Sequence, residues 1–430
     1  WLVEPDAALE QRLLPRLTRS QSEVMINARS VRRRRVKGAA GSGKSLALVG
    51  RAAWLTRRER DVQHKGEVLV VCFNITLVGY LRDSTRPFFH AFDFEPQRIT
   101  YLHWHAWARR AMQTAGCGAR WKEAVQAHGP NAPALGDTVA STLAGAELAG
   151  VARYDAILVD EGQDLEPEWW DALRTVLRDP EHGELLLVAD DAQDIYDRGT
   201  SWTDRPMEGL GFSGPWLRLE GSHRLPSRLI DVARSIAGGW LGVPEEDLPA
   251  EPAQTEIEVE PVRLRWVNVN EEEVGNAVRS ATEEMLAASR GPGLDLLAWA
   301  DIVIVADTLE RGRQALASIP NTVARIHTYD ADERIQRRRK MVFFKGDGRL
   351  KATTIHSIKG WECSALVVIV GPNSGRRAAS LLYTALTRLK RRVGGSHLTV
   401  VCADPTFEPI GRLFGPEADG DCRPAGGGSA

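Results

Sequence analysis

A glycine-rich segment, GAAGSGKS at residues 38–45, carries residue types suited to binding a triphosphate. It fits the pattern G-x-x-x-x-G-K-[ST], in which glycines let backbone N–H groups turn toward phosphate oxygens and the following helix adds its positive end. The lysine of this pattern reaches the outer phosphates and the hydroxyl binds Mg²⁺; a purely structural glycine turn is the alternative. ATP and Mg²⁺ are therefore the predicted cofactors, and their predicted contacts are Gly38, Ala39, Ala40, Gly41, Ser42, Gly43, Lys44 and Ser45.

Two adjacent carboxylates follow an apolar run in AILVDEGQD, residues 156–164. Such a run predicts a buried strand, and ligands bind beyond the carboxyl ends of parallel strands. We expect Asp160 to hold Mg²⁺ through its water shell and Glu161 to orient and deprotonate the attacking water, because water is a poor nucleophile unless it is placed in line. A solvated Asp-Glu pair on a loop is the alternative. Farther along, VADDAQDIYDRG (188–199) offers Gln193, which can contact a γ-phosphate or the water.

The elements that must position these residues alternate between short apolar runs and helical patterns, which is typical of parallel sheets wrapped by helices. The predicted fold class is α/β. The first domain is predicted over residues 1–214, with a small helical insert at about 115–150, and the second over 215–415; residues 416–430 are expected to be a disordered tail. Buried strands are predicted at 68–73, 156–161, 185–190, 301–307, 366–371 and 398–404.

The bulk composition is that of an ordinary globular protein, with 430 residues, 43% hydrophobic content and a formal net charge of −2. A generally basic protein is excluded, so a polyanion must meet a local basic surface. The five cysteines are scattered without a CxxC pair, which argues against a zinc site or a disulfide framework and favours a reducing, cytoplasmic location. No apolar run reaches membrane-spanning length, so no membrane partner is expected. The sequence starts at Trp1 without a Met, and we expect a preceding segment.

Further segments occur in order between Leu17 and Arg388: LTRSQ (17–21), VVCFNITLVGYLRD (70–83), HWHAWARR (103–110), LEGSHRLPSRL (219–229), TTIHSIKGWE (353–362) and YTALTRLKRR (383–392). Together with the two motifs above, their order and spacing resemble superfamily 1 DNA helicases of the UvrD/Rep/PcrA type. The resemblance implies two RecA-like P-loop domains with an ATP-binding cleft between them.

The resemblance also implies roles for individual residues. Gln21 hydrogen-bonds the adenine edge and Glu362 takes the ribose hydroxyl. Arg224 and Arg388 reach the γ-phosphate from the second domain, where arginines stabilise transition-state charge. His223 stands where the family has the tyrosine that stacks on adenine, which puts the stacking in doubt. Two domains that close on ATP and open after hydrolysis would grip a strand alternately, as a translocase does.

Single-stranded DNA is the partner that the resemblance implies, held by phosphate contacts and base stacking. For Trp202 a core position, and for His356 a structural role, are the alternatives. The candidate DNA contacts are Asn74, His105, Tyr196, Trp202 and His356.

The chain is smaller than the helicases it resembles. Its first insert is only about 35–50 residues, smaller than a typical domain, and the second accessory subdomain looks absent. The predicted function is therefore an ATP hydrolase that moves on single-stranded DNA, 3′→5′ by resemblance, with DNA-stimulated ATPase and weak unwinding. The alternative is an ATP-gated recognition or regulatory module. The compact form also resembles the helicase-like half of bacterial proteins joined to a nuclease-related domain, so a nuclease is an expected partner, preceding the chain or separate.

Four consecutive arginines, residues 32–35, precede the glycine-rich segment. Because the carboxyl end of the strand points toward the nucleotide, these residues should lie toward the opposite end of the sheet. We expect only about RVKG (35–38) to be strand, and the arginines to form a surface patch on the rim of the first domain that solvent, a partner or DNA contacts.

Overall fold

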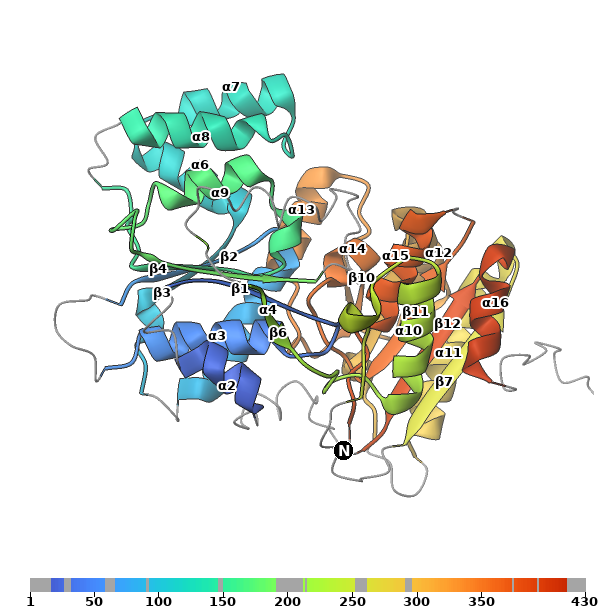
Figure 1. Cartoon of the computed structure of the whole chain (residues 1–430). Coiled ribbons are helices and arrows are strands. Elements are labelled where there is room, and N and C mark those ends of the chain that lie inside the picture. The colour runs from blue at the N-terminus through green and yellow to red at the C-terminus, as the bar shows by residue number, and fades with distance from the viewer. Residues whose placement is uncertain are drawn as a thin grey trace, which may run out of the picture.

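The computed structural model describes residues 17–26, 32–58, 66–89, 93–145, 150–190, 212, 215–251, 261–290, 296–372, 375–392 and 394–415. Within them the chain forms two six-stranded sheets, each flanked by helices (Figure 1). Every strand pair in both sheets is parallel. The predicted α/β class is confirmed.

The first sheet carries the glycine-rich segment and the Asp-Glu pair. Its strands, in spatial order, are β3 (Ile99–His103), β2 (Val68–Cys72), β4 (Ala156–Val159), β5 (Glu184–Ala189), β1 (Arg33–Gly38) and β6 (Leu217–Leu219). One face is covered by α2 (Arg19–Ile26), α3 (Lys44–Leu55) and α4 (Ile75–Thr85), and the other by α6 (Trp104–Thr114), α7 (Gly118–His128), α8 (Ala134–Gly145) and α9 (Pro167–Arg174) (Figure 1). Along β2, Val68 and Val70 pack on the first group and Leu69 and Val71 on the second, as strand alternation requires.

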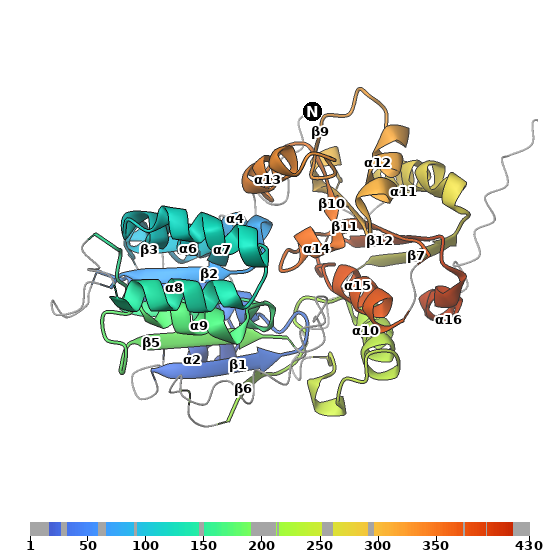
Figure 2. The ribbon, with the colours of Figure 1, turned by 90° about the horizontal axis from the view of Figure 1, so that it is seen from above.

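The second sheet has the spatial order β7 (Val262–Asn268), β12 (Ser396–Cys402), β11 (Ala365–Val370), β8 (Ile302–Ala306), β10 (Leu350–Thr354) and β9 (Arg325–His327). One face packs on α11 (Val274–Ala288) and α12 (Leu309–Ser318), and the other on α10 (Ser227–Gly239), α14 (Ile355–Ile358), α15 (Arg376–Leu386) and α16 (Glu408–Gly411). Helix α13 (Glu333–Val342) lies against α4 of the first unit, and α14 also contacts α4 (Figure 2).

All six predicted strands are confirmed, with ends that differ from the prediction by at most two residues. The predicted insert contains α7 and α8. The predicted end of the first domain, residue 214, precedes β6, and β6 pairs with β1 through Val36–Gly38, so the first sheet extends to Leu219. The predicted tail, 416–430, lies outside the described residues.

The arginine run lies inside the first sheet, and the prediction that the strand begins only near Arg35 is wrong. Strand β1 begins at Arg33 and pairs with β5 from Arg33 to Lys37. On its other side β6 covers only Val36–Gly38. In the part of the chain that the structure describes, the first half of β1 is therefore a sheet edge, where charged side chains are well tolerated because they can leave the sheet.

The arginine patch expected at the surface is exposed only in part, because Arg32 is exposed and Arg34 and Arg35 are half-buried, whereas Arg33 is buried. Arg33 is only 8% exposed, and its Nη2 donates to the carbonyl oxygen of Pro180 at 2.5 Å. The Arg35 guanidinium lies over the Trp216 ring, 5.1 Å from its centroid. A guanidinium on a long aliphatic stem can cover apolar surface while its head finds carbonyl and aromatic partners, so an arginine-rich strand can still pack.

Candidate functional site

The carboxyl ends of β1, β5 and β4 are neighbours because these parallel strands are adjacent in the sheet. The glycine-rich segment follows β1, and Gly41 and Gly43 both have φ of +84°. A Cβ on Gly41 would lie 2.3 Å from Ser222 Oγ, and one on Gly43 would lie 2.3 Å from Gln21 Nε2. Both the left-handed backbone and these close approaches require glycine.

Lys44 is the first residue of α3 and is 9% exposed. Its ammonium donates to the carbonyl oxygens of Gly38 at 2.6 Å and Ala39 at 3.1 Å, and pairs with Asp190 Oδ2 at 3.1 Å. Sequence reasoning missed Asp190. The signal was present, because Asp190 directly follows the apolar strand β5 as Asp160 directly follows β4.

Asp160 is 1% exposed, and its Oδ1 accepts a hydrogen bond from the backbone N–H of Glu161 at 3.1 Å. Burial and then the charge of Glu161 raise the pKa of Asp160 to about 7, although the hydrogen bond with Ser45 opposes this. Its Oδ2 is buried without a hydrogen-bond partner. A carboxylate beside a hydroxyl is a donor set that fits Mg²⁺, which usually takes one or two protein ligands and completes its shell with phosphate and water. No cluster of three or more His, Cys, Asp or Glu side chains suited to a metal occurs among the described residues.

Glu161 is held in a left-handed conformation, with φ of 51° and ψ of 47°, which costs a non-glycine residue about 1–2 kcal/mol. Gln163 Nε2 donates to Glu161 Oε2 at 2.6 Å, and Gln163 Oε1 accepts from the backbone N–H of Asp190 at 3.2 Å. Burial alone would raise the pKa of Glu161, but the charges of Lys359, Arg388 and Lys44 outweigh it and leave the pKa lowered. The side chain is therefore a fixed, ionised carboxylate, as a general base must be.

Lys359 is a second residue that sequence reasoning missed. It belongs to the second unit and is 1% exposed, yet its ammonium donates to Asp164 Oδ1 at 2.7 Å and Oδ2 at 2.9 Å and lies 3.7 Å from Glu161 Oε2. A buried charge of this kind is stable only when it is paired. The ion pair therefore joins the two units directly at the predicted catalytic carboxylate.

The two units meet at two contact sites, here called joints. The first is the Lys359–Asp164 ion pair, and the second surrounds Asn74, the N-cap of α4. Its Nδ2 donates to the carbonyl oxygens of His356 and Ser357, both at 3.1 Å. Thr76 Oγ1 also donates to the carbonyl oxygen of Ser357, and Trp361 Nε1 donates to that of Thr76 at 3.2 Å. The predicted DNA contacts Asn74 and His356 are thus brought together at the joint, and their role in DNA binding stays a prediction.

Gly360 lies in the same joint, at the third position of a turn closed by the hydrogen bond from Trp361 N to Ile358 O at 2.9 Å. Its φ is +85°, and a Cβ there would lie 2.5 Å from Leu77 Cδ1 of α4. Only glycine satisfies both the turn and the contact.

We expect Gly360→Ala to lower the free energy of unfolding by about 1–2 kcal/mol for the backbone conformation, plus about 1–3 kcal/mol for overpacking against Leu77. Gly116→Ala is the matched control, because Gly116 has φ of +75° but nothing within 4 Å of the position of its Cβ. Denaturant unfolding of both variants measures the difference. Equal losses would show that the contact with Leu77 does not constrain the joint.

Of the two arginines predicted to sense the γ-phosphate, Arg388 lies near Glu161 and Arg224 lies beside Arg388. Arg224 donates to Glu362 Oε1 at 3.3 Å and to the carbonyl oxygen of Thr387 at 2.7 Å. Arg388 is 1% exposed. Burial and then the neighbouring charge of Arg224 lower the pKa of Arg388 to about 10, against the opposing effect of Glu161. Two guanidinium groups held together beside a carboxylate form a concentrated positive site suited to an anion.

The segment that carries Arg224 lies between the glycine-rich segment and the end of α15. Ser222 Oγ donates to the carbonyl oxygen of Ala40 at 2.8 Å, and the backbone N–H of His223 donates to that of Gly41 at 3.0 Å. The His223 side chain is exposed. The segment that carries Arg224 is therefore held against the predicted phosphate loop by backbone and hydroxyl contacts. The His223 imidazole takes no part in these contacts.

Gln21 also supports this loop. It is 3% exposed, its Nε2 donates to the carbonyl oxygen of Ser42 at 2.8 Å, and its Oε1 accepts from the backbone N–H of Thr18 at 2.9 Å. The predicted contact of Gln21 with adenine stays a prediction. In this structure the side chain also holds the glycine-rich segment in place through Ser42.

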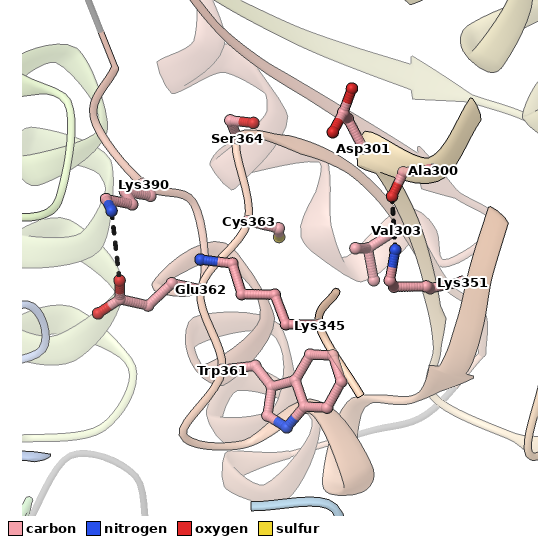
Figure 3. A pocket seen from close by; sticks show the side chains of 10 residues that line it. All are labelled: Ala300, Asp301, Val303, Lys345, Lys351, Trp361, Glu362, Cys363, Ser364 and Lys390. Carbon is pink, nitrogen blue, oxygen red and sulfur yellow. Dashed lines mark hydrogen bonds and ion pairs between the residues drawn. The ribbon is translucent and has the colours of Figure 1, made fainter. Parts of the chain in front are cut away.

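Glu362, the predicted ribose contact, lines a small cavity in the second unit (Figure 3). One of its oxygens lies 4.0 Å from Lys390 Nζ. On the opposite side of the cavity, Lys351 Nζ donates to the carbonyl oxygen of Ala300 at 2.6 Å (Figure 3). Glu362 thus both contacts Arg224 and lines this cavity.

His105, another predicted DNA contact, lies in an aromatic cluster rather than at the joint. Its Nε2 is 2.6 Å from the carbonyl oxygen of Pro130, so this nitrogen carries the proton. Its ring is edge-on to Phe73 and to Trp169. The remaining candidates Gln193, Tyr196 and Trp202 lie outside the described residues.

The four cysteines in the described ranges form no disulfide. Among the helices that the structure describes, none combines the length and the apolar character that crossing a membrane requires. Comparison with protein-family models gives no match for this chain, and comparison with curated proteins gives no relative.

Proposed function

We propose that this protein is an ATP-driven translocase on single-stranded DNA, which hydrolyses ATP between two P-loop-type units. The observation that carries the proposal is the approach of Lys359 and Arg388 of the second unit to Glu161 of the first, with Arg224 beside Arg388. A hydrolase confined to one unit would not need cations from the other. A motor needs them, because its two units must respond to the terminal phosphate.

In the proposed mechanism, ATP would supply the free energy through its hydrolysis, and bound Mg²⁺ would neutralise part of the negative charge of the ATP phosphates. The backbone of the glycine-rich segment and Lys44 bind the phosphates, while Ser45 and Asp160 hold the metal. Glu161, fixed by Gln163, orients the attacking water and takes its proton. The guanidinium groups of Arg224 and Arg388 stabilise the charge that develops on the transferred group.

The two joints would couple this chemistry to movement. Lys359 pairs with Asp164 and lies near Glu161, so a change of charge at Glu161 acts on the residue that holds the units together. Lys359 is also adjacent to the turn at Gly360, and its carbonyl oxygen is 3.4 Å from Asn74 Nδ2. ATP state and the contact between α4 and α14 would therefore change together, which lets the units alternate their grip on a strand.

The test is steady-state ATPase with and without a single-stranded oligonucleotide, paired with displacement of streptavidin from biotin at either end. We expect DNA to stimulate ATPase and streptavidin to be cleared from one end only. Clearance of the 5′ end indicates 3′→5′ movement. An ATPase that DNA leaves unchanged would contradict the proposal, and stimulation without clearance would favour the ATP-gated recognition module.

A further inference from the structure

Helix α13 carries more basic residues than any other helix of the described chain, and nothing above gives it a role. Its sequence, ERIQRRRKMV, holds five basic residues and one acidic residue, and none of its ten residues is buried. In a chain whose formal net charge is −2, such a concentration is local and requires a reason. A solvated helix face is the ordinary one, so the surroundings of α13 must decide.

Part of this charge is neutralised within the second unit. Arg339 Nε pairs with Asp330 Oδ2 at 3.2 Å, and its Nη1 lies 2.6 Å from His327 Nε2. Arg334, Arg337 and Arg338 are exposed, and none of them forms an ion pair with a carboxylate within the described residues. These three guanidinium groups therefore remain available to an external anion.

The position of α13 places this charge beside the joint between the units. The helix lies against α4 of the first unit (Figure 2). Arg337 is close enough to His103, at the end of β3, to contribute to the lowering of its pKa, as does Arg109 of α6. Burial is the larger cause of that shift. The basic surface is therefore shared between α13 and the first unit.

Within the second unit, the same surface continues from α13 onto α15. His356 lies in the joint, and after burial the charges of Arg377 and Lys340 are the largest contributors to the lowering of its pKa. Arg109, Arg337 and Arg377 are all exposed. A surface that is basic on both units fits one long polyanion that crosses from one unit to the other.

We propose that α13 is a phosphate-binding element, in which Arg334, Arg337 and Arg338 bind the backbone of the DNA strand engaged at the joint. This inference rests on the proposed function. An acidic protein is the competing partner, and exposed apolar side chains at the end of the helix (Met341, 63%, and Val342, 58%) would suit it. The nucleic acid is favoured because the positive charge extends over both units, whereas the exposed apolar residues (Ile335, Met341, Val342 and Phe344) are confined to α13 and the residues just after it.

The test compares the full chain with Arg334→Gln, Arg337→Gln and Arg338→Gln combined. A matched triple control, Arg263→Gln, Arg279→Gln and Arg412→Gln, removes the same charge from β7, α11 and η10 (Arg412–Phe414). These elements lie away from α13, toward the other edge of the second sheet (Figure 2). The probe is a fluorescent oligothymidylate, with binding measured by anisotropy from low to high salt, and thermal unfolding confirms that each variant folds.

Each phosphate contact on a single strand contributes about 0.7 to the slope of log K against log salt. The α13 variant should therefore lose about 2 from the slope and bind about 100-fold more weakly at 0.1 M salt. The control variant should keep most of the wild-type slope and affinity. Equal binding by wild type and the α13 variant would overturn the inference and leave the proposed function standing. The same assay is repeated with a blunt duplex probe. Weaker binding of the α13 variant to the duplex but not to oligothymidylate would also overturn the inference. Absence of DNA binding by wild type would overturn both.

Discussion

Glu161→Gln is expected to lower the kcat of ATP hydrolysis by about 10²–10⁴, the usual contribution of a positioned general base. The amide cannot take a proton from water, but it keeps nearly the same shape and can still hydrogen-bond Gln163. Lys44, Ser45 and the glycine-rich segment are unchanged, so affinity for ATP should stay within about threefold, because removing a transition-state interaction leaves ground-state binding in place. The measurement is single-turnover hydrolysis together with binding of a fluorescent ATP analogue.

The control for this substitution is Asp171→Asn, on α9 of the same unit, where the carboxylate is 62% exposed. It removes the same charge and should leave kcat unchanged. The substitution at residue 161 also removes the negative charge near Lys359, so unfolding must be measured beside the rate. A variant that hydrolyses ATP at nearly the wild-type rate would mean that another group activates the water, and Asp164 and Asp190 would be the next carboxylates to test.

Much of the fold could be predicted because its signals are local. A run such as VLVVC, short and rich in valine, favours a parallel strand that is buried on both faces, as β2 is. Strand β10, LKATT, was missed because a lysine and three polar or small residues do not form an apolar run. It is nevertheless fully buried, since Lys351 Nζ donates to the carbonyl oxygens of Ala300 and Asp347, both at 2.6 Å. Partners that lie far away in the sequence made this strand possible, and the sequence alone does not reveal them.

The candidate site divides in the same way. Lys44, Asp160 and Glu161 follow from motifs in which spacing alone determines the geometry. The pairing of Lys359 with Asp164 spans 195 residues, and each residue taken singly is an ordinary charge beside a glycine or a glutamine. Their meeting depends on how two separately folded sheets face one another. Asp190 lies between these cases, because its position after β5 is a local signal that becomes informative once β5 is known to neighbour β1.

Arg388→Lys is expected to lower kcat by about 10³ or more, since an arginine that stabilises phosphoryl-transfer charge contributes about 10³–10⁵. Lysine keeps the positive charge but loses the planar fork, and Arg388 uses that fork, with Nε donating to the carbonyl oxygen of Thr384 at 3.0 Å and Nη2 to Thr387 Oγ1 at 3.1 Å. Arg376→Lys, at the exposed start of α15, is the control and should leave the rate unchanged.

A double-mutant cycle with Arg224→Lys tests whether the two arginines act on one charge. If both stabilise the same developing negative charge, the double variant should lose little more than the worse single variant, because residues that act as a unit are strongly non-additive. Losses that add fully would mean that Arg224 and Arg388 act at separate places. The proximity of Arg224 to Arg388, which helps to lower the pKa of Arg388, would then be a feature of folding rather than of hydrolysis. An unchanged rate in Arg388→Lys would remove the strongest reason to regard the contact between the two units as a motor.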